Sequence, residues 1–166
     1  MNKLLFFSFF VFLFVSCTEN QTTKNLHQSP DIENSVEAQK SVALKFINDY
    51  VENANLMGKA IETRKWVAQN TLVTESFKKT VTTMIDEAEK DDPELGLGFD
   101  PIFDAQDYPE EGFQAEQIDE KTNLVTVSGK KWNDFKPKIK PPLINGNWLV
   151  DGAGAVNISS KERINR

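Results

Sequence analysis

Apolar residues recur every three or four positions in three segments of the chain, and this spacing predicts amphipathic helices. The segments cover residues 34–57, 60–67 and 74–90. Asn34 and Glu37 stand three positions apart at the start of the first segment, as in a capping box, so we place the beginning of the domain there. The third segment opens on a threonine, a residue suited to cap a helix.

The period changes to two after residue 112, which is typical of strands with one buried face. We expect strands over residues 113–118, 124–128, 136–140 and 156–158. The pair Asn145-Gly146 favours a tight hairpin turn after the third strand. Trp148 follows that turn, and we expect its side chain to lie in the core.

The order of these elements predicts the fold class. Helices that precede an antiparallel meander favour an α+β fold, with the helices packed on one face of the sheet. The chain length suits a single domain, which we place at residues 34–160, followed by a polar tail at residues 161–166.

Residues 91–112, here named the acidic loop, join the last helix to the first strand. They include eight acidic residues, three prolines and three glycines, and no lysine or arginine. They also include six large apolar or aromatic residues, which a solvated linker would not need. A loop of this length is uncommon in a compact domain unless it is functional, so we expect it to pack onto the domain.

Polar residues of the acidic loop, together with four aromatic residues, are the candidates for a pocket or binding site. They are Asp100, Asp104, Gln106, Asp107, Tyr108, Trp66, Tyr50 and Trp132. The aspartates lack the spacing of a calcium-binding EF-hand, so we predict no metal site, and we expect no cofactor. In the simplest interpretation they form turns of the loop backbone. The alternative is a general acid–base pair with a raised pKa, in a pocket walled by the aromatic residues.

Two features of the composition limit the possible functions. The only histidine, His27, precedes the predicted domain, which excludes a histidine general base in the folded part. The formal net charge of −6 argues against general electrostatic binding of nucleic acid, although residues 130–140 contain five lysines. These lysines are expected to lie near the acidic loop and to offset part of its charge. Trp132 stands among them and is a candidate for an exposed contact residue.

The first residues indicate export. The apolar run at residues 4–15 has the size of a signal sequence and is too short to span a bilayer stably. Cys17, the only cysteine, ends the sequence FVSC, which resembles the lipobox of bacterial lipoproteins. The resemblance implies a signal peptide at residues 1–16, a diacylglycerol on Cys17 and a lipidated tether over residues 17–33. The alternative is an ordinary signal peptide and a free thiol.

Several stretches together carry a second resemblance: FINDYV at residues 46–51, Trp66, TESF at residues 74–77, and the longer segments 92–109 and 146–157. In these stretches the chain resembles uncharacterised bacterial lipoproteins with a nuclear-transport-factor-2-like domain. The resemblance implies a curved antiparallel sheet wrapped by helices, with a pocket at the open end of this cone. It implies no activity, because enzymes built on the same cone carry motifs that this chain does not match.

The expected function is therefore that of a lipid-anchored protein of the bacterial cell envelope, in the outer membrane. We expect a non-catalytic binding or accessory module. Its partners would be the membrane, through the N-terminal lipid, and an envelope protein or a small ligand, but not nucleic acid. Two alternatives stay open: a hydrolase or isomerase that uses aspartates of the acidic loop, and a purely structural envelope protein.

Overall fold

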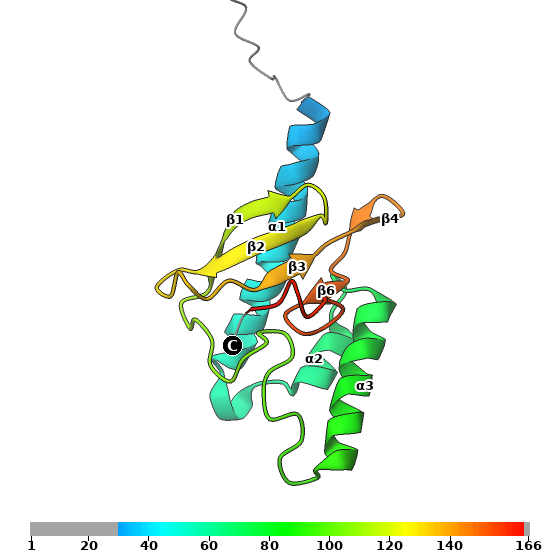
Figure 1. Cartoon of the computed structure of the whole chain (residues 1–166), viewed down its shortest axis with the longest axis vertical. Coiled ribbons are helices and arrows are strands. Elements are labelled where there is room, and N and C mark those ends of the chain that lie inside the picture. The colour runs from blue at the N-terminus through cyan, green and yellow to red at the C-terminus, as the bar shows by residue number, and fades with distance from the viewer. Residues whose placement is uncertain (1–29, 165–166) are drawn as a thin grey trace, which may run out of the picture.

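The computed structural model describes residues 30–164, with side chains from residue 35 onward. The predicted signal sequence, Cys17 and most of the predicted tether lie outside the described residues. Three helices precede all the strands (Figure 1): α1 (Pro30–Ala54), α2 (Thr63–Gln69) and α3 (Glu75–Asp91), with a short 3-10 helix at Met57–Lys59. Within residues 30–164, none of the helices has the length and apolarity that crossing a membrane requires.

Six short strands follow the helices. They are β1 (Phe113–Asp119), β2 (Leu124–Gly129), β3 (Lys138–Lys140), β4 (Leu143–Ile144), β5 (Asn147–Trp148) and β6 (Gly152–Ala153). The main sheet has the order β1-β2-β3-β6, and each neighbouring pair is antiparallel. β4 and β5 form a separate hairpin. Three helices packed against an antiparallel sheet confirm the predicted α+β class.

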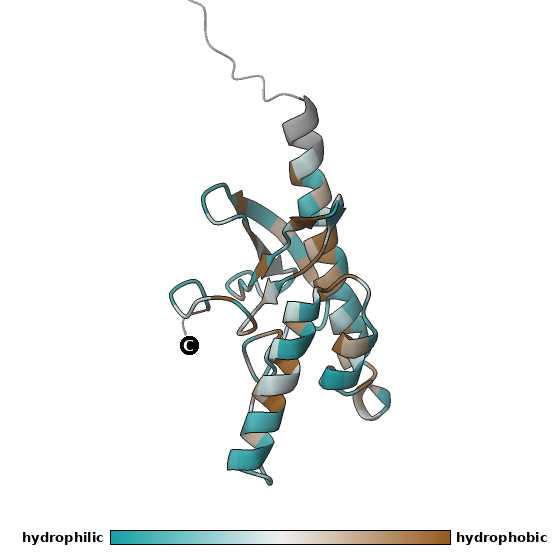
Figure 2. Cartoon of the chain, turned by 90° about the vertical axis from the view of Figure 1, so that its right-hand side faces the viewer, coloured by the Kyte–Doolittle hydropathy of each residue, from teal (hydrophilic) through white to brown (hydrophobic). Residues whose placement is uncertain are grey.

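The core lies between α1, α3, the acidic loop and the inner strands of the sheet. β2 is buried along its whole length, and α1 packs over β1 and β2. Phe46 of α1 and Phe77 of α3 are fully buried and meet edge to face, with their ring centroids 5.5 Å apart. Figure 2 shows hydrophilic and hydrophobic residues alternating along the helices, as expected where one face is buried.

Several element boundaries differ from the predicted ones: α2 begins three residues later than predicted and β3 two residues later. α1 begins at Pro30, so Asn34 lies inside the helix and does not start it. Proline suits the first turn of a helix because its missing N–H would have no helical partner there. The strand predicted at residues 156–158 is also wrong: Val156 bonds back to Ala153 in a tight turn that follows β6.

The prediction that Trp148 belongs to the core is wrong as well. Its side chain is half-buried and lines a surface groove together with Leu143. The physical reason is the turn at Asn145-Gly146, which folds β4 and β5 into a hairpin outside the main sheet. The chain returns to the core only at Val150, which is fully buried.

α1 runs antiparallel to β1, and its side chains fix both ends on the sheet. Near the start of the helix, Gln39 donates a hydrogen bond to the carbonyl of Asn123, in the turn after β1. Further along, Asn48 bonds both the N–H and the carbonyl of Phe113, where β1 begins. The domain therefore has two distinct ends: one at the start of α1, beside the hairpin, and one at the end of α1, beside the acidic loop (Figure 1).

Candidate functional site

Asp100 shapes the backbone of the acidic loop. Its Oδ1 accepts hydrogen bonds from the backbone N–H of Ile102 at 2.8 Å and of Phe103 at 2.9 Å. Its own N–H donates to the carbonyl of Ala105. These bonds confirm the turn-forming role predicted for this aspartate. Because Ile102 and Phe103 are buried, the turn also attaches the middle of the loop to the core, as predicted.

The second carboxylate oxygen of Asp100 is bonded to the helices. Tyr50 of α1 donates its hydroxyl to Oδ2 at 2.5 Å, and the same hydroxyl lies 2.8 Å from Oγ1 of Thr63. The ring of Tyr50 packs between Trp66 and Phe103, with centroid distances of 4.8 Å and 4.9 Å. Tyr50 and Trp66 were both predicted as pocket residues, but Tyr50 is buried in the core and Trp66 is half-buried against it.

The environment of this pair raises the pKa of both groups. Burial raises the pKa of the Asp100 carboxyl, although the hydrogen bonds from Tyr50 and from two backbone N–H groups oppose the change. Burial, and then the charge of Asp100, raise the pKa of Tyr50, so its phenol stays protonated. A carboxyl with a raised pKa is typical of a general acid. The oxygens of Asp100 and Tyr50 are already hydrogen-bonded within the protein, however, so the pair is a structural contact.

Replacing Asp100 should change how stability depends on pH. Because the folded carboxyl has a raised pKa, its favourable contribution is complete below its ordinary pKa of 3.8 and is lost as the pH rises through the folded value. We expect the free energy of unfolding of the wild type, minus that of Asp100→Asn, to fall as the pH rises above the ordinary pKa of the carboxyl. Urea titrations at several pH values measure this difference. A difference that grows with pH would contradict the raised pKa.

Asp104 is bound by the C-terminal segment. It is 1% exposed and accepts two hydrogen bonds from Arg163, Nε to Oδ2 at 2.9 Å and Nη2 to Oδ1 at 2.6 Å. This two-bond geometry is the strong form of an ion pair between arginine and a carboxylate. Residues 161–166 were predicted to be a polar tail, but this contact folds Arg163 back onto the acidic loop.

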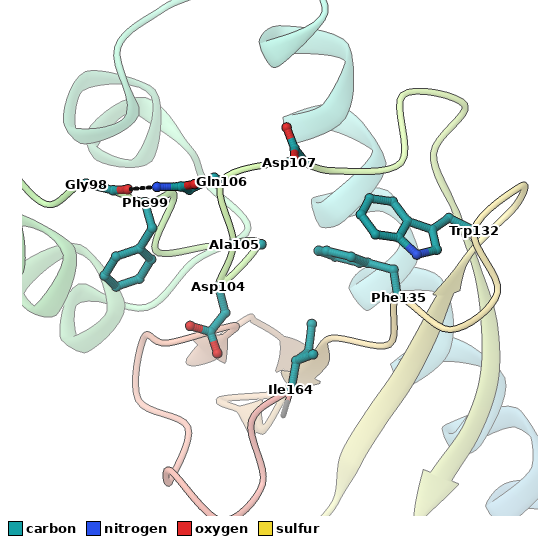
Figure 3. Close-up of a pocket in the computed structure, with 9 residues that line it drawn as sticks. All are labelled: Gly98, Phe99, Asp104, Ala105, Gln106, Asp107, Trp132, Phe135 and Ile164. Atoms are coloured by element: carbon teal, nitrogen blue, oxygen red, sulfur yellow. Dashed lines mark hydrogen bonds between the residues drawn. The ribbon is translucent and has the colours of Figure 1, made fainter. Parts of the chain in front are cut away.

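An open cleft lies beside this ion pair, between the acidic loop and the connection from β2 to β3 (Figure 3). Loop residues 98–99 and 104–107 form one wall, and Trp132, Phe135 and Ile164 form the other. The volume of this space, here named the Trp132 cleft, is about 450 Å³. A cleft of this size suits a small ligand or a large side chain of a protein partner.

Trp132 is the most exposed aromatic side chain of the cleft. It remains 45% exposed, and its ring lies 4.9 Å from that of Phe135, which is buried. On the opposite wall the amide of Gln106 donates to the carbonyl of Gly98 at 3.0 Å, which fixes the loop backbone there. Asp107 is exposed. The cleft therefore combines a preformed aromatic wall with a polar one.

The lysine-rich segment and the acidic loop lie side by side, as predicted. Lys131, next to Trp132, forms an ion pair with Glu111 of the loop at 2.8 Å. The hydrogen bond between them lowers the pKa of Glu111 and raises that of Lys131. Both side chains are exposed, so the pair orders the surface near the cleft more than it stabilises the fold.

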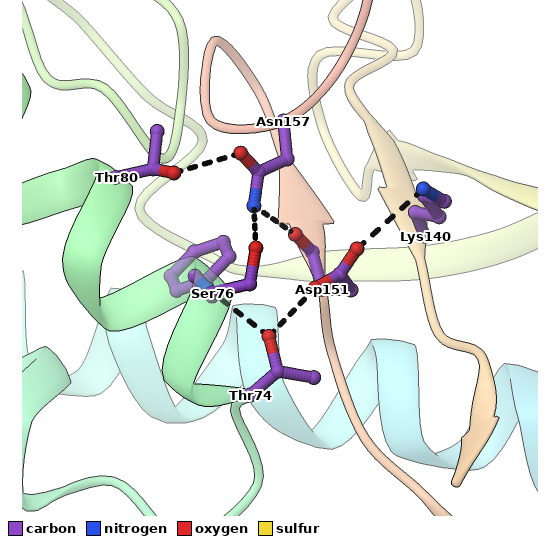
Figure 4. A network of polar contacts seen from close by, with 7 residues as sticks. Thr74, Ser76, Thr80, Lys140, Asp151 and Asn157 are labelled. Atoms are coloured by element: carbon purple, nitrogen blue, oxygen red, sulfur yellow. Dashed lines mark hydrogen bonds and ion pairs between the residues drawn. The ribbon is translucent and has the colours of Figure 1, made fainter.

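A second polar cluster ties the start of α3 to the strands (Figure 4). Thr74 caps α3 as predicted: its Oγ1 accepts from the N–H of Phe77 and donates to Asp151 at 2.7 Å. Asp151 also pairs with Lys140, and the amide of Asn157 donates to the Asp151 carbonyl at 2.7 Å. Since its members satisfy one another, this cluster is a structural clamp.

The structure separates the eight predicted site residues into two groups. Four of them line the Trp132 cleft: Asp104, Gln106, Asp107 and Trp132. The other four surround the buried ring of Phe103 or its neighbours: Tyr50, Trp66, Asp100 and Tyr108. Across residues 35–164, no three side chains of the metal-binding types are grouped so that they would hold an ion.

Sequence reasoning missed several residues of the cleft. Phe135 stands three positions after Trp132 in the lysine-rich segment, and this spacing was the available signal. Arg163 and Ile164 carried no local signal, because the contact between Arg163 and Asp104 joins positions 59 residues apart.

Comparisons with models of protein families, with curated proteins and with solved structures find no match to this chain.

Proposed function

We propose that this chain is a lipid-anchored protein of the bacterial envelope whose domain binds a partner, without catalysis, through the Trp132 cleft. The observation that carries the proposal is the exposed indole of Trp132 above the buried ring of Phe135. Tryptophan is enriched among the few residues that contribute most of the binding energy at protein interfaces. The partner would place an apolar or aromatic group in the cleft.

The positions of the carboxylates favour binding over catalysis. Asp100 holds the loop turn and the Tyr50 hydroxyl, and it does not line the cleft. Asp104 lines the cleft but is bonded twice to Arg163. Asp107 is exposed to water, which competes for its charge. A general acid or base needs a carboxyl that can reach a substrate proton, and the carboxyls of Asp100 and Asp104 are engaged elsewhere.

We further propose that the domain is a nuclear-transport-factor-2-like cone. Helices precede the antiparallel sheet, α1 lies along β1 and β2, and the Trp132 cleft is at one end of this layer pair. A pocket at the open end is what the sequence resemblance implies. In this proposal the cleft lies at the end of the domain away from the start of α1, so a lipid anchor ahead of α1 would leave the cleft accessible.

Lipid anchoring has a direct test in the bacterial host. We expect Cys17→Ser to abolish the incorporation of labelled fatty acid. Most of the protein should then leave the membrane fraction, or it should keep an uncleaved signal peptide. The control variant Ser16→Ala, at the neighbouring position, should keep both the fatty-acid labelling and the membrane association. Unchanged labelling of the Cys17→Ser protein would contradict the anchoring proposal.

Partner binding is tested by photo-crosslinking in cells. A photoreactive phenylalanine analogue in place of Trp132 should yield a discrete adduct of higher mass. The same analogue in place of Leu95, which is 70% exposed on the acidic loop outside the cleft wall, should yield much less. A small-ligand partner would appear by mass spectrometry as a small mass increase on residue 132.

Equal labelling at both positions would contradict a specific cleft. A purely structural envelope protein predicts no adduct at residue 132. An enzyme that uses the loop aspartates predicts product formation that is lost in Asp107→Asn.

A further inference from the structure

The hairpin formed by β4 and β5 differs in composition from the rest of the molecule. Residues 141–150 contain no charged side chain, although 27% of the chain is charged. Leu143 is 56% exposed and Ile144 is 37% exposed. Trp148 lies beside them and is half-buried. A solvated hairpin would carry polar residues at these positions, so the apolar side chains need an explanation.

The hairpin presents these side chains in a preformed geometry. Leu143 pairs with Trp148 and Ile144 with Asn147 across the two strands. The turn between them consists of Asn145 at φ 50° and Gly146 at φ 80°, the left-handed pair that two-residue hairpins favour. The apolar residues are thus fixed on a projection outside the main sheet.

The hairpin sits near the beginning of α1. The buried amide of Gln39 donates to the carbonyl of Pro141 at 3.4 Å and to that of Asn123 at 3.2 Å. Gln39 lies about 14 Å along the helix from Pro30, from the rise of an α-helix. Figures 1 and 2 both show the start of α1 at this end of the molecule, and Figure 1 places the hairpin beside it.

We infer that this hairpin inserts its apolar side chains into the surface of the lipid bilayer to which the chain is anchored. The inference rests on the lipid anchoring in the proposed function. The chain between Cys17 and Pro30 can span at most about 45 Å, so an anchored domain stays within reach of the bilayer. Since the chain enters the domain at the start of α1, the hairpin belongs to the end that the anchor holds nearest to the lipid.

The energetics suit a weak contact that the anchor assists. Three apolar side chains are far fewer than the roughly 20 residues per side of a stable protein interface, which disfavours a second copy of the chain as the occupant. An anchored domain has a high local concentration at the bilayer, so a small apolar contact is enough to orient it. Tryptophan is favoured at the boundary between headgroups and acyl chains.

Charge contributes little to this contact. Lys140 flanks the hairpin but pairs with Asp151, and Lys121 in the turn after β1 stands next to Glu120. The surface near the hairpin therefore has mixed charge, and burial of apolar area is the expected driving force. A bilayer of zwitterionic lipid should then suffice.

The test uses the mature chain, beginning at Cys17, coupled through its only thiol to maleimide-bearing lipid in phosphatidylcholine vesicles. Lipids brominated in their acyl chains quench tryptophan fluorescence on contact. We expect clear quenching in the wild type and in Trp132→Phe, and a loss of at least half of that quenching in Trp148→Phe. Leu143→Ser combined with Ile144→Ser should reduce it to the same extent. Trp132 serves as the matched control because it is exposed at the opposite end of β2.

Quenching that persists in Trp148→Phe, or that is absent in the wild type, would overturn the inference. The inference would also be overturned if the variant with Leu143→Ser and Ile144→Ser changed the sedimentation of the uncoupled chain but not the quenching. That result would mean that the hairpin binds a second copy of the chain. Chemical coupling supplies the anchor, so the result does not depend on lipidation in cells. Failure of the Cys17→Ser test and failure of hairpin insertion are therefore separate outcomes.

Discussion

Gly154→Ala should destabilise the domain by roughly 3 kcal/mol or more, which is a large fraction of the free energy of unfolding of an ordinary domain. Gly154 has φ +56°, a left-handed conformation that an alanine adopts only at a cost. A Cβ at this position would also lie 2.3 Å from the carbonyl oxygen of Ile102 and 2.7 Å from that of Pro101. Both are backbone atoms, so no side-chain rotation relieves the clash.

A second glycine separates the two causes. Gly146 has φ +80° in the hairpin turn, and a Cβ there would meet nothing within 4 Å. Gly146→Ala should therefore cost about 1 kcal/mol, for the backbone conformation alone. Urea unfolding of both variants gives the comparison. Equal losses would contradict the close contact between Gly154 and the backbone of the acidic loop.

The close approach at Gly154 explains how the acidic loop is held. The next residue, Ala155, donates its N–H to the carbonyl of Pro101 at 2.8 Å. The loop is thus fixed by the turn after β6 on one side and by the buried Ile102 and Phe103 on the other. Since this loop forms one wall of the Trp132 cleft, the glycine also determines the shape of the cleft.

Periodicity predicted α3 and β1, whose burial is one-sided, and a run rich in β-branched residues predicted β2, which is buried throughout. α3 follows its apolar spacing from the cap at Thr74 onward, and β1 and β2 lie close to the predicted strands. The predictions for Trp148 and for residues 156–158 failed for a common reason: burial there depends on where the segment packs, and the local pattern does not show this. Trp148 has a core-like composition around it, but the hairpin leaves the sheet. Val156 is buried in a turn, and the local pattern of a buried turn resembles that of a short strand.

The candidate site could be predicted in part. The acidic loop was identified because its length and its apolar residues are unusual for a connector, and Trp132 because it stands in the lysine-rich segment. The turn-forming role predicted for the aspartates holds for Asp100, but the side-chain partners of the aspartates could not be predicted. Asp100 and Asp104 are four positions apart in one loop, yet one meets Tyr50 of α1 and the other meets Arg163 near the end of the chain. Those partners are set by the fold.

Arg163→Ala should be the second most destabilising of the substitutions considered, with a loss of about 2–4 kcal/mol in the free energy of unfolding. The substitution removes two short hydrogen bonds from a carboxylate that is almost completely buried. Breaking a buried ion pair from one side is costly because the remaining charge stays in the interior. The arginine itself is 28% exposed, so the expected loss is below that of a fully buried pair.

A surface ion pair beside the same cleft provides the control. Lys131→Ala removes the contact with Glu111, where both side chains are exposed, and should change stability by less than about 0.5 kcal/mol. If Arg163→Ala were as mild as Lys131→Ala, Arg163 would not hold the acidic loop. A much larger loss for Arg163→Ala than for Lys131→Ala would mean that the contact of Arg163 with Asp104 holds the C-terminal segment against the Trp132 cleft. Partner binding at Trp132 and the stability of this segment would then depend on the same contact.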